Sequence, residues 1–175
     1  TMGKEVVLLI GANGANVHGV ITLLGGQSNV DIVALDGQPL DESLVPYCTR
    51  VIQGDILDNI LLGRLVAEFE IRTIFHLASI LSTKAEYNPA TAHRVNVEGT
   101  LNLLRLAVEQ TSWQGRTVKF IYPSSTAAYG LPHLLTTQPT GKLLEGDWLQ
   151  PITMYGCSHM YVDLLGPYRA RRCAP

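Results

Sequence analysis

The sequence has no hydrophobic run approaching the roughly 20 residues that a bilayer-spanning helix needs, and no basic-then-apolar N-terminal segment typical of a secretory signal. It also carries little net charge, −2 at pH 7 with a pI near 6.2. A global basic field that would attract nucleic acid or anionic lipid is therefore missing. We expect a cytoplasmic protein whose partner is a small soluble molecule, with no nucleic acid and no membrane bound.

Cysteine is scarce, and the three copies are Cys48, Cys157 and Cys173. Their number is odd and their spacing matches no metal site, so the sequence indicates neither a disulfide framework nor a zinc site. We expect reduced thiols and no metal. The 175 residues, 46% of them hydrophobic, are enough for one well-buried domain and short for two. The expectation is one domain over 1–175.

Short, near-continuous apolar runs predict strands that are buried on both faces, as in a parallel sheet. Segments with helical spacing separate them and would cover the sheet. The predicted strands are 6–10, 30–35, 50–52, 73–77 and 118–122, and the predicted helices are 17–24, 56–68, 90–109 and 154–171. This alternation predicts an α/β fold, a Rossmann-like doubly wound parallel sheet. Proline and glycine mark 131–151 as a long loop, and such loops are usually functional or disordered.

A glycine-rich turn follows the first predicted strand and opens a helix, with the sequence GANGANVHG from Gly11 to Gly19. Gly11 and Gly14 would permit positive φ, and the backbone around Asn13 could then approach a pyrophosphate at the helix N-terminus. A tight strand-to-helix turn without a ligand is the alternative.

Asp36 ends the second predicted strand, 22 residues beyond Gly14, near the spacing of about 20 for an acid that binds the adenosine ribose. Its carboxylate would accept hydrogen bonds from a 2′-hydroxyl and repel a 2′-phosphate, which favours NAD over NADP. A turn role before Gly37 is the alternative.

Several further motifs occur in a characteristic order along almost the whole chain. They are Leu9–Gly14, Asp36, Gly54-Asp55-Ile56, His76-Leu77-Ala78-Ser79, Asn96–Thr100, Ser124–Gly130 and Tyr155-Gly156. The chain thereby resembles the NAD-dependent epimerase/dehydratase family of extended short-chain dehydrogenases/reductases. The stretch 74–100 also resembles the short-chain type of L-threonine 3-dehydrogenase.

The resemblance implies roles for four further parts of the cofactor site. Asp55 and the backbone of Ile56 would recognise adenine, unless Asp55 only caps a turn. Leu77, Ala78 and Ser79 would pass beside the cofactor. His76 is more typical of a satisfied core histidine than of a catalyst. Asn96 would position main chain or water near the nicotinamide, or else make an ordinary helix contact.

The same resemblance implies the catalytic groups. Ser125, four residues before Tyr129, would hold the substrate hydroxyl, with Ser124 and Thr126 as neighbours; such hydroxyls can also merely cap a turn. Tyr155 would be the acid/base. A free tyrosine has a pKa of about 10, and the family lowers it with nearby positive charge.

That charge is normally a lysine four residues after the tyrosine, where this sequence has His159. The spacing puts His159 on the same helical face as Tyr155, so it could contact a ribose hydroxyl of the cofactor. A histidine is mostly neutral at pH 7, so weak or absent activity is expected. A helix-surface role for His159 is the alternative.

Two other departures from the family pattern affect the prediction. Val17 occupies the place of the third glycine, unless the alignment shifts to use Gly19. Family members continue for well over a hundred residues beyond Pro175, so the C-terminal substrate region is expected to be largely absent. The uncovered sheet edge and apolar surface would favour self-association, and the resemblance predicts a homodimer through 90–109 and 154–171.

The sequence therefore predicts an NAD-dependent oxidoreductase or epimerase that acts on a hydroxyl-bearing small molecule such as a nucleotide sugar, a sugar acid or a hydroxy amino acid. Tyrosine- and serine-assisted hydride transfer would be its chemistry. A catalytically inactive NAD-binding module is the alternative, favoured by Val17, His159 and the missing C-terminal region.

Overall fold

The computed structural model describes residues 4–14, 17–130, 144 and 149–173, with the side chains of 172 and 173 excluded. The chain forms two compact units. Unit 1 comprises Thr1–Ser79 and Glu98–Pro123, and unit 2 comprises Ile80–Val97 and Ser124–Pro175.

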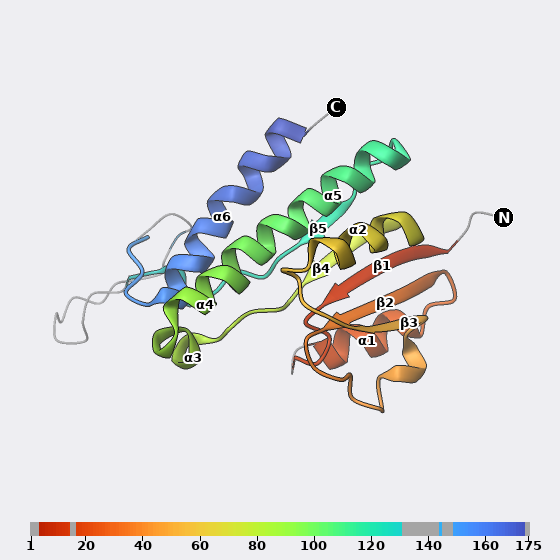
Figure 1. Ribbon diagram of the computed structural model, residues 1–175, viewed down its shortest axis with the longest axis horizontal. Helices are drawn as coiled ribbons and strands as arrows, with labels where there is room; N and C mark the ends of the chain where they lie inside the picture. Colours follow the sequence, from red (N-terminus) through yellow and green to blue (C-terminus); the bar gives the residue numbers. More distant parts are fainter. Residues whose placement is uncertain (1–3, 15–16, 131–143, 145–148, 174–175) are drawn as a thin grey trace. The chain divides into compact units, whose positions relative to one another are not determined.

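Unit 1 is built on a five-stranded parallel sheet (Figure 1). The strands are β1 (Glu5–Ile10), β2 (Val30–Asp36), β3 (Arg50–Gln53), β4 (Ile71–His76) and β5 (Lys119–Ile121), in the order β3-β2-β1-β4-β5. Chain order reverses direction at β1, which makes the carboxyl ends of β1 and β4 the place where ligands bind in such sheets. The predicted Rossmann-like doubly wound sheet is confirmed.

Right-handed crossovers put the helices of unit 1 on opposite faces of the sheet. Helix α1 (Val17–Gly25) connects β1 to β2, and the short η1 (Val45–Tyr47) lies between β2 and β3. Helices α2 (Asn59–Glu68) and α5 (Thr100–Gln114) precede β4 and β5 and pack against each other. Leu8 and Leu9 in the central strand are fully buried, because both faces are covered.

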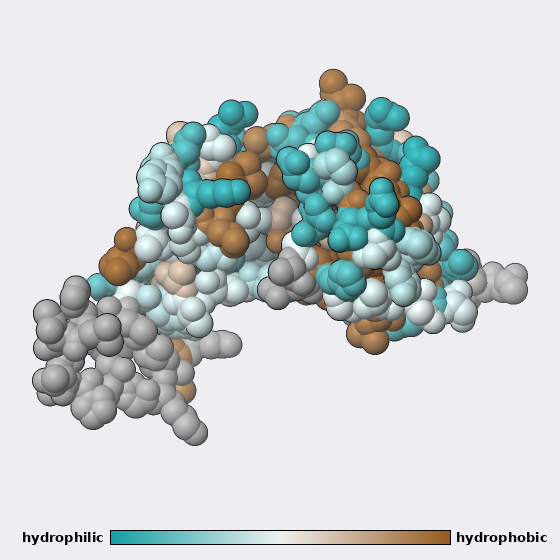
Figure 2. Space-filling view, turned by 90° about the horizontal axis from the view of Figure 1, so that it is seen from below, coloured by the Kyte–Doolittle hydropathy of each residue, from teal (hydrophilic) through white to brown (hydrophobic). Residues whose placement is uncertain are grey.

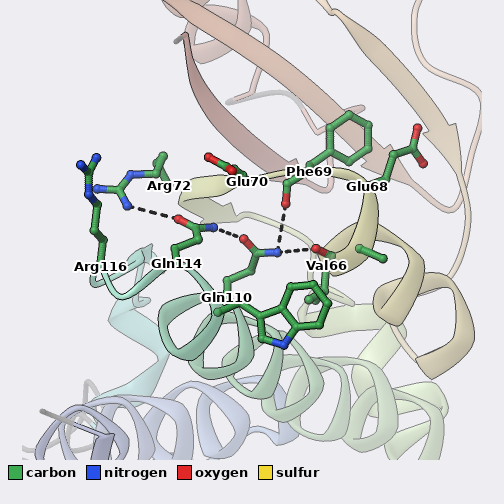
Figure 3. A pocket seen from close by; sticks show the side chains of 10 residues that line it. Val66, Glu68, Phe69, Glu70, Arg72, Gln110, Gln114 and Arg116 are labelled. Carbon is green, nitrogen blue, oxygen red and sulfur yellow. Dashed lines mark hydrogen bonds between the residues drawn. The ribbon is translucent and has the colours of Figure 1, made fainter. Parts of the chain in front are cut away.

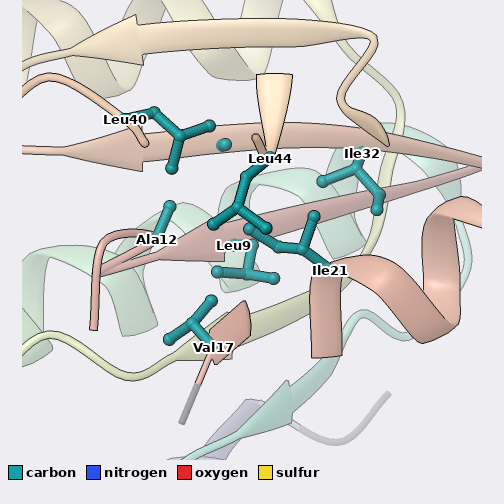
Figure 4. Packing of buried hydrophobic residues seen from close by; sticks show 8 residues of the cluster. Leu9, Ala12, Val17, Ile21, Ile32, Leu40 and Leu44 are labelled. Atoms are coloured by element: carbon teal, nitrogen blue, oxygen red, sulfur yellow. The ribbon is translucent and has the colours of Figure 1, made fainter. Parts of the chain in front are cut away.

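Val17 belongs to the apolar core beneath α1 (Figure 4). It is 1% exposed. The other buried members are Leu9, Ala12, Ile21, Ile32, Ala34, Leu40 and Leu44. Side chains from β1, α1 and β2 thus pack against those of the segment after β2. The role that the structure shows for Val17 is therefore packing in this core.

The helix predicted over 56–68 begins three residues later, at Asn59. Asp58 is the reason: its carboxylate accepts hydrogen bonds from the N–H groups of Ile60, at 2.9 Å, and Leu61, at 3.0 Å. Aspartate is among the best N-cap residues, so the helix starts directly after it.

The helix predicted over 90–109 is helical throughout, but it runs from Pro89 to Gln114 and contains a π-helical turn that the spacing did not predict. The chain forms α3 (Ser82–Tyr87) and α4 (Pro89–His93), passes through a π-helical turn (Arg94–Gly99), and only then continues as α5 to Gln114. Asn88 caps α4 through its side chain, and Pro89 takes the first helical position, where a missing N–H costs nothing.

Unit 2 consists of α3, α4, the short η3 (Thr126–Ala128) and the long α6 (Met154–Cys173), against which the other three pack. The predicted helix over 154–171 is confirmed. Most of the predicted loop 131–151 lies outside the described residues. Within the described part of the chain, no helix is both long and apolar enough to cross a membrane.

Several large apolar side chains of α6 are exposed: Tyr161 at 47%, Leu164 at 63% and Tyr168 at 48%. Figure 2 shows brown hydrophobic residues interspersed with teal hydrophilic ones on one face of the molecule. The homodimer through 90–109 and 154–171 stays a prediction.

Candidate functional site

The turn after β1 packs directly on the segment after β4. Gly11 has a φ of 80°, in the left-handed region, and its N–H donates to the carbonyl of Leu35 at 2.9 Å. A Cβ on Gly11 would lie 2.5 Å from the backbone nitrogen of Ala78. Only glycine fits there, because both the backbone angle and the space exclude a side chain.

Asp36 braces this turn from the end of β2. One carboxylate oxygen accepts the N–H of Asn13 and the other accepts the N–H of Gln38, both at 2.8 Å. The predicted cofactor residues of β1 and β2 are thus joined. The carboxylate thereby makes the turn contact that was the alternative to ribose binding, and ribose binding by Asp36 stays a prediction.

The side chain of Asn13 anchors a segment that the sequence did not single out. Its amide donates to the carbonyl of Pro39 at 2.9 Å, and its amide oxygen accepts the N–H of Asp41 at 3.3 Å. Hydrogen bonds from Ser43 lower the pKa of the Asp41 carboxyl. No sequence signal marks this contact, because it joins a polar turn to an irregular loop 26 residues away.

A cavity of about 250 Å³ opens beside Asp36 in unit 1. Its lining comes from the turn, β2, the loop after β2, and β3, and includes Ala12, Gln38, Pro39 and Gln53. This position at the carboxyl edge suits a ligand that reaches the Asp36 carboxylate.

Gly19 does not replace the missing third glycine. It is exposed in α1 and has nothing within 4 Å of its Cβ position. Val17 instead fills the core below the turn, and its N–H donates to the carbonyl of Gly14 at 2.9 Å. The alignment that puts Val17 at the third position is therefore the one that the packing supports.

The residues after β3 show local structural roles. Asp55 is exposed, and its carboxylate accepts the N–H of Leu57 at 2.9 Å, which is the turn role. Ile56 is buried, and its side chain packs so closely on Gly99 that a Cβ added to that glycine would lie 2.4 Å from it. Its carbonyl accepts a hydrogen bond from the side chain of Asn102 at 3.2 Å. Adenine recognition by Asp55 and Ile56 stays a prediction.

The segment after β4 lies against the glycine turn, and its contact with a cofactor stays a prediction. The N–H of Leu77 donates to the carbonyl of Ile10 at 2.9 Å, which keeps the chain beside the glycine turn through Ala78 to Ser79. His76 is fully buried, with Nε2 2.8 Å from the Thr100 hydroxyl. It is the predicted core histidine.

Asn96 lies in the π-helical turn and is 2% exposed. Within unit 2 its amide oxygen accepts the N–H of Ile80 at 2.7 Å, and its amide nitrogen donates to the carbonyl of the same residue at 3.0 Å. It therefore positions main chain.

Unit 2 brings the predicted catalytic residues onto α6 and the turn that packs on it. Ser125 caps η3, and its hydroxyl accepts the N–H of Ala127 at 3.2 Å. Gly156 lets α6 approach this turn: a Cβ there would be within 2.0 Å of the Ala127 carbonyl oxygen. Tyr155, beside Gly156, is consequently held at the helix end nearest η3.

The rings of Tyr155 and His159 are in edge-to-face contact, with centroids 4.3 Å apart and planes at 63°. His159 is 3% exposed, so it is not a helix-surface residue. Burial lowers the pKa of His159, and the charge of Asp163 opposes that effect. The net lowering makes the imidazole mainly neutral at pH 7, unlike a lysine.

A larger cavity of about 640 Å³ lies at the opposite edge of the sheet, where α2 leads into β4 (Figure 3). Gln110 dominates it: the side chain donates to the carbonyls of Val66 and Phe69 and accepts the N–H of Ile71. Gln114 bonds to Gln110 in turn. These contacts join α5 to β4, and the amino edge of a parallel sheet is not where ligands bind.

Cys48 and Cys157 are free thiols, and burial raises the pKa of the Cys48 thiol. The side chain of Cys173 lies outside the described residues. Among the described residues, no three histidine, cysteine, aspartate or glutamate side chains gather to hold a metal ion.

The model of the NAD-dependent epimerase/dehydratase family matches residues 2–172. The chain belongs to this family. A human mitochondrial protein named inactive L-threonine 3-dehydrogenase is 29% identical over 160 residues, which are 91% of this chain and 65% of that protein.

Solved structures of an epimerase and a dehydrogenase are similar to this chain in fold and sequence. UDP-glucose 4-epimerase from Brucella ovis, in complex with NAD, is 27% identical with a TM-score of 0.78, covering 95% of this chain and 48% of that one. L-threonine dehydrogenase from Clostridium difficile is 29% identical with a TM-score of 0.73, covering 97% and 50%. The chain thus spans about half the length of these solved relatives.

Proposed function

We propose that unit 1 binds NAD at the carboxyl edge of its sheet. The observation that carries this proposal is the fit of Gly11 against Ala78, which leaves a bare backbone turn between two strand ends. Helix α1 starts after that turn, and the N–H groups of a first helical turn attract the negative charge of a pyrophosphate. NAD in a relative's structure supports the assignment.

Asp36 suits the adenosine ribose. Each of its oxygens accepts one backbone N–H, and an ionised carboxylate can accept about four hydrogen bonds, so capacity remains for ribose hydroxyls. Its negative charge would repel a 2′-phosphate. Asp55, Ile56, Leu77, Ala78, Ser79 and Asn96 are the further proposed cofactor residues.

Calorimetric titration with NAD and, separately, NADP tests this site. We expect micromolar binding of NAD and at least about tenfold weaker binding of NADP, because a phosphate and a carboxylate would meet at short range. Asp36→Asn keeps an acceptor for the Asn13 N–H but removes the charge, so it should bring the two affinities close together.

Glu109→Gln is the matched control, since Glu109 is exposed on α5 and its loss should leave both affinities unchanged. No heat with either nucleotide, from a protein that circular dichroism shows to be folded, would remove the NAD assignment.

We further propose that the chain is the cofactor-binding part of an oxidoreductase or epimerase that acts on a hydroxyl-bearing small molecule: a nucleotide sugar, a sugar acid or a hydroxy amino acid. Bound NAD supplies a nicotinamide that accepts a hydride. The Ser125 hydroxyl, which accepts the Ala127 N–H, keeps its own proton to donate to the substrate oxygen. Tyr155 takes the proton of the substrate hydroxyl.

A catalytically inactive NAD-binding module is the second candidate, favoured by the buried histidine in place of lysine. His159→Lys discriminates between the two. A lysine is charged at pH 7, so it should raise the rate of NADH formation with a panel of hydroxy amino acids at least about tenfold, while NAD affinity stays constant. Unchanged turnover would favour the module.

A further inference from the structure

Helix α6 carries three chemically active side chains one turn apart: Tyr155, His159 and Asp163. Residues four apart lie on the same helical face. The phenol, the imidazole and the carboxylate therefore form a row along one side of α6. The contact between the rings of Tyr155 and His159 connects the first pair. The second pair is one helical turn apart on α6, so the Asp163 carboxylate opposes the lowering of the His159 pKa by burial.

Ser124 fixes the carboxylate from outside the helix. Its hydroxyl donates to Oδ2 of Asp163 at 2.6 Å, across 39 residues of sequence. Ser124 directly precedes Ser125, so the same short segment holds Asp163 and presents the proposed substrate-binding hydroxyl. This contact has no place in the proton transfer described above.

We propose that Asp163, held by Ser124 one helical turn beyond His159, is a positioning residue whose negative charge favours a proton on His159 beside Tyr155. The inference rests on the proposed function. A positive charge on an imidazole in contact with the tyrosine ring would stabilise a phenolate. Without the carboxylate, burial would act unopposed and lower the pKa of His159 further.

Other charged groups near α6 do not take this role. The described elements that pack on α6 bring Lys84, Glu86, Tyr87 and His93 from α3 and α4, while η3 has none and is followed by Tyr129. Glu86 accepts the N–H of Met154 at the start of α6. Of the charged groups on these elements, Asp163 is the one whose charge acts on His159.

The test is an NMR titration of the histidine side chains of the whole chain, with the His159 signal identified by its loss in His159→Gln. We expect Asp163→Asn, which keeps an oxygen for Ser124 but loses the charge, to reduce the proton affinity of His159 about threefold. Asp163→Glu should restore it in part. Ser124→Ala should also reduce the proton affinity of His159, but by a smaller factor, and Glu109→Gln should leave that affinity unchanged.

An identical His159 titration in Asp163→Asn and the unmodified chain would overturn the inference. NAD titration of the same proteins separates the two proposals, because the histidine measurement needs no nucleotide. Loss of NAD binding by the unmodified chain would remove the proposed function but leave the Asp163 result standing.

Discussion

Gly11→Ala is expected to weaken NAD binding about a hundredfold and to lower the free energy of unfolding by about 3 kcal/mol. Two costs combine. Alanine at a φ of 80° is strained, and its methyl group would meet the backbone of Ala78 and Leu77 at 2.5 to 2.8 Å. Backbone cannot rotate away as a flexible side chain can, so the turn must move. Calorimetric titration and urea denaturation measure the two losses.

Gly63→Ala provides the matched control for this variant. Gly63 is exposed in the middle of α2 and has nothing within 4 Å of its Cβ position. Alanine favours a helix interior by up to about 1 kcal/mol over glycine, so this change should stabilise the chain slightly and leave NAD affinity intact. Equal NAD affinity in Gly11→Ala and the control would show that the turn does not form the nucleotide site.

The sheet could be predicted from the sequence because its central strands are buried on both faces. Val6 to Ile10 are apolar throughout, as β1 must be to pass between two helical layers, and β2 has a buried apolar run from Ile32 to Leu35. The edge strand β3 is mostly exposed, and its signal is only the apolar pair Val51 and Ile52. Gly11 and Asp36 were predictable for a related reason: a turn at a strand end and an acid at the next strand end meet at one edge of a parallel sheet.

The remaining features depend on packing that no local pattern encodes. The π-helical turn from Arg94 to Gly99 contains Asn96, which bonds to Ile80. No glycine or proline precedes Gly99 in this turn, so the sequence gives no signal for it. The hydrogen bonds of Asn13 with the loop after β2 are another case. His159 could be placed on the face of Tyr155 by its spacing, but its burial follows from the elements that pack on α6.

The closeness of α6 to η3 is the feature of unit 2 on which the proposed chemistry depends most. Ser125 is the N-cap of η3 and Tyr155 is the second residue of α6, so both proposed catalytic residues are positioned by the same contact. Gly156 permits it, since its Cβ position overlaps the carbonyl group of Ala127 and is 2.9 Å from Cβ of Pro151. Any side chain at this position would push the helix away from the turn.

Gly156→Ala should therefore destabilise unit 2, although glycine-to-alanine changes in helices usually stabilise. The overlap with backbone should outweigh the helix preference of about 1 kcal/mol and leave a net loss of about 2 kcal/mol. Hydrogen exchange should accelerate over Met154–Ser158, and turnover, where present, should fall with little change in NAD affinity. The control is Gly63→Ala in α2, where the Cβ position has open space around it. Unchanged exchange at the start of α6 in Gly156→Ala would mean that this contact does not hold Tyr155 and Ser125 in place.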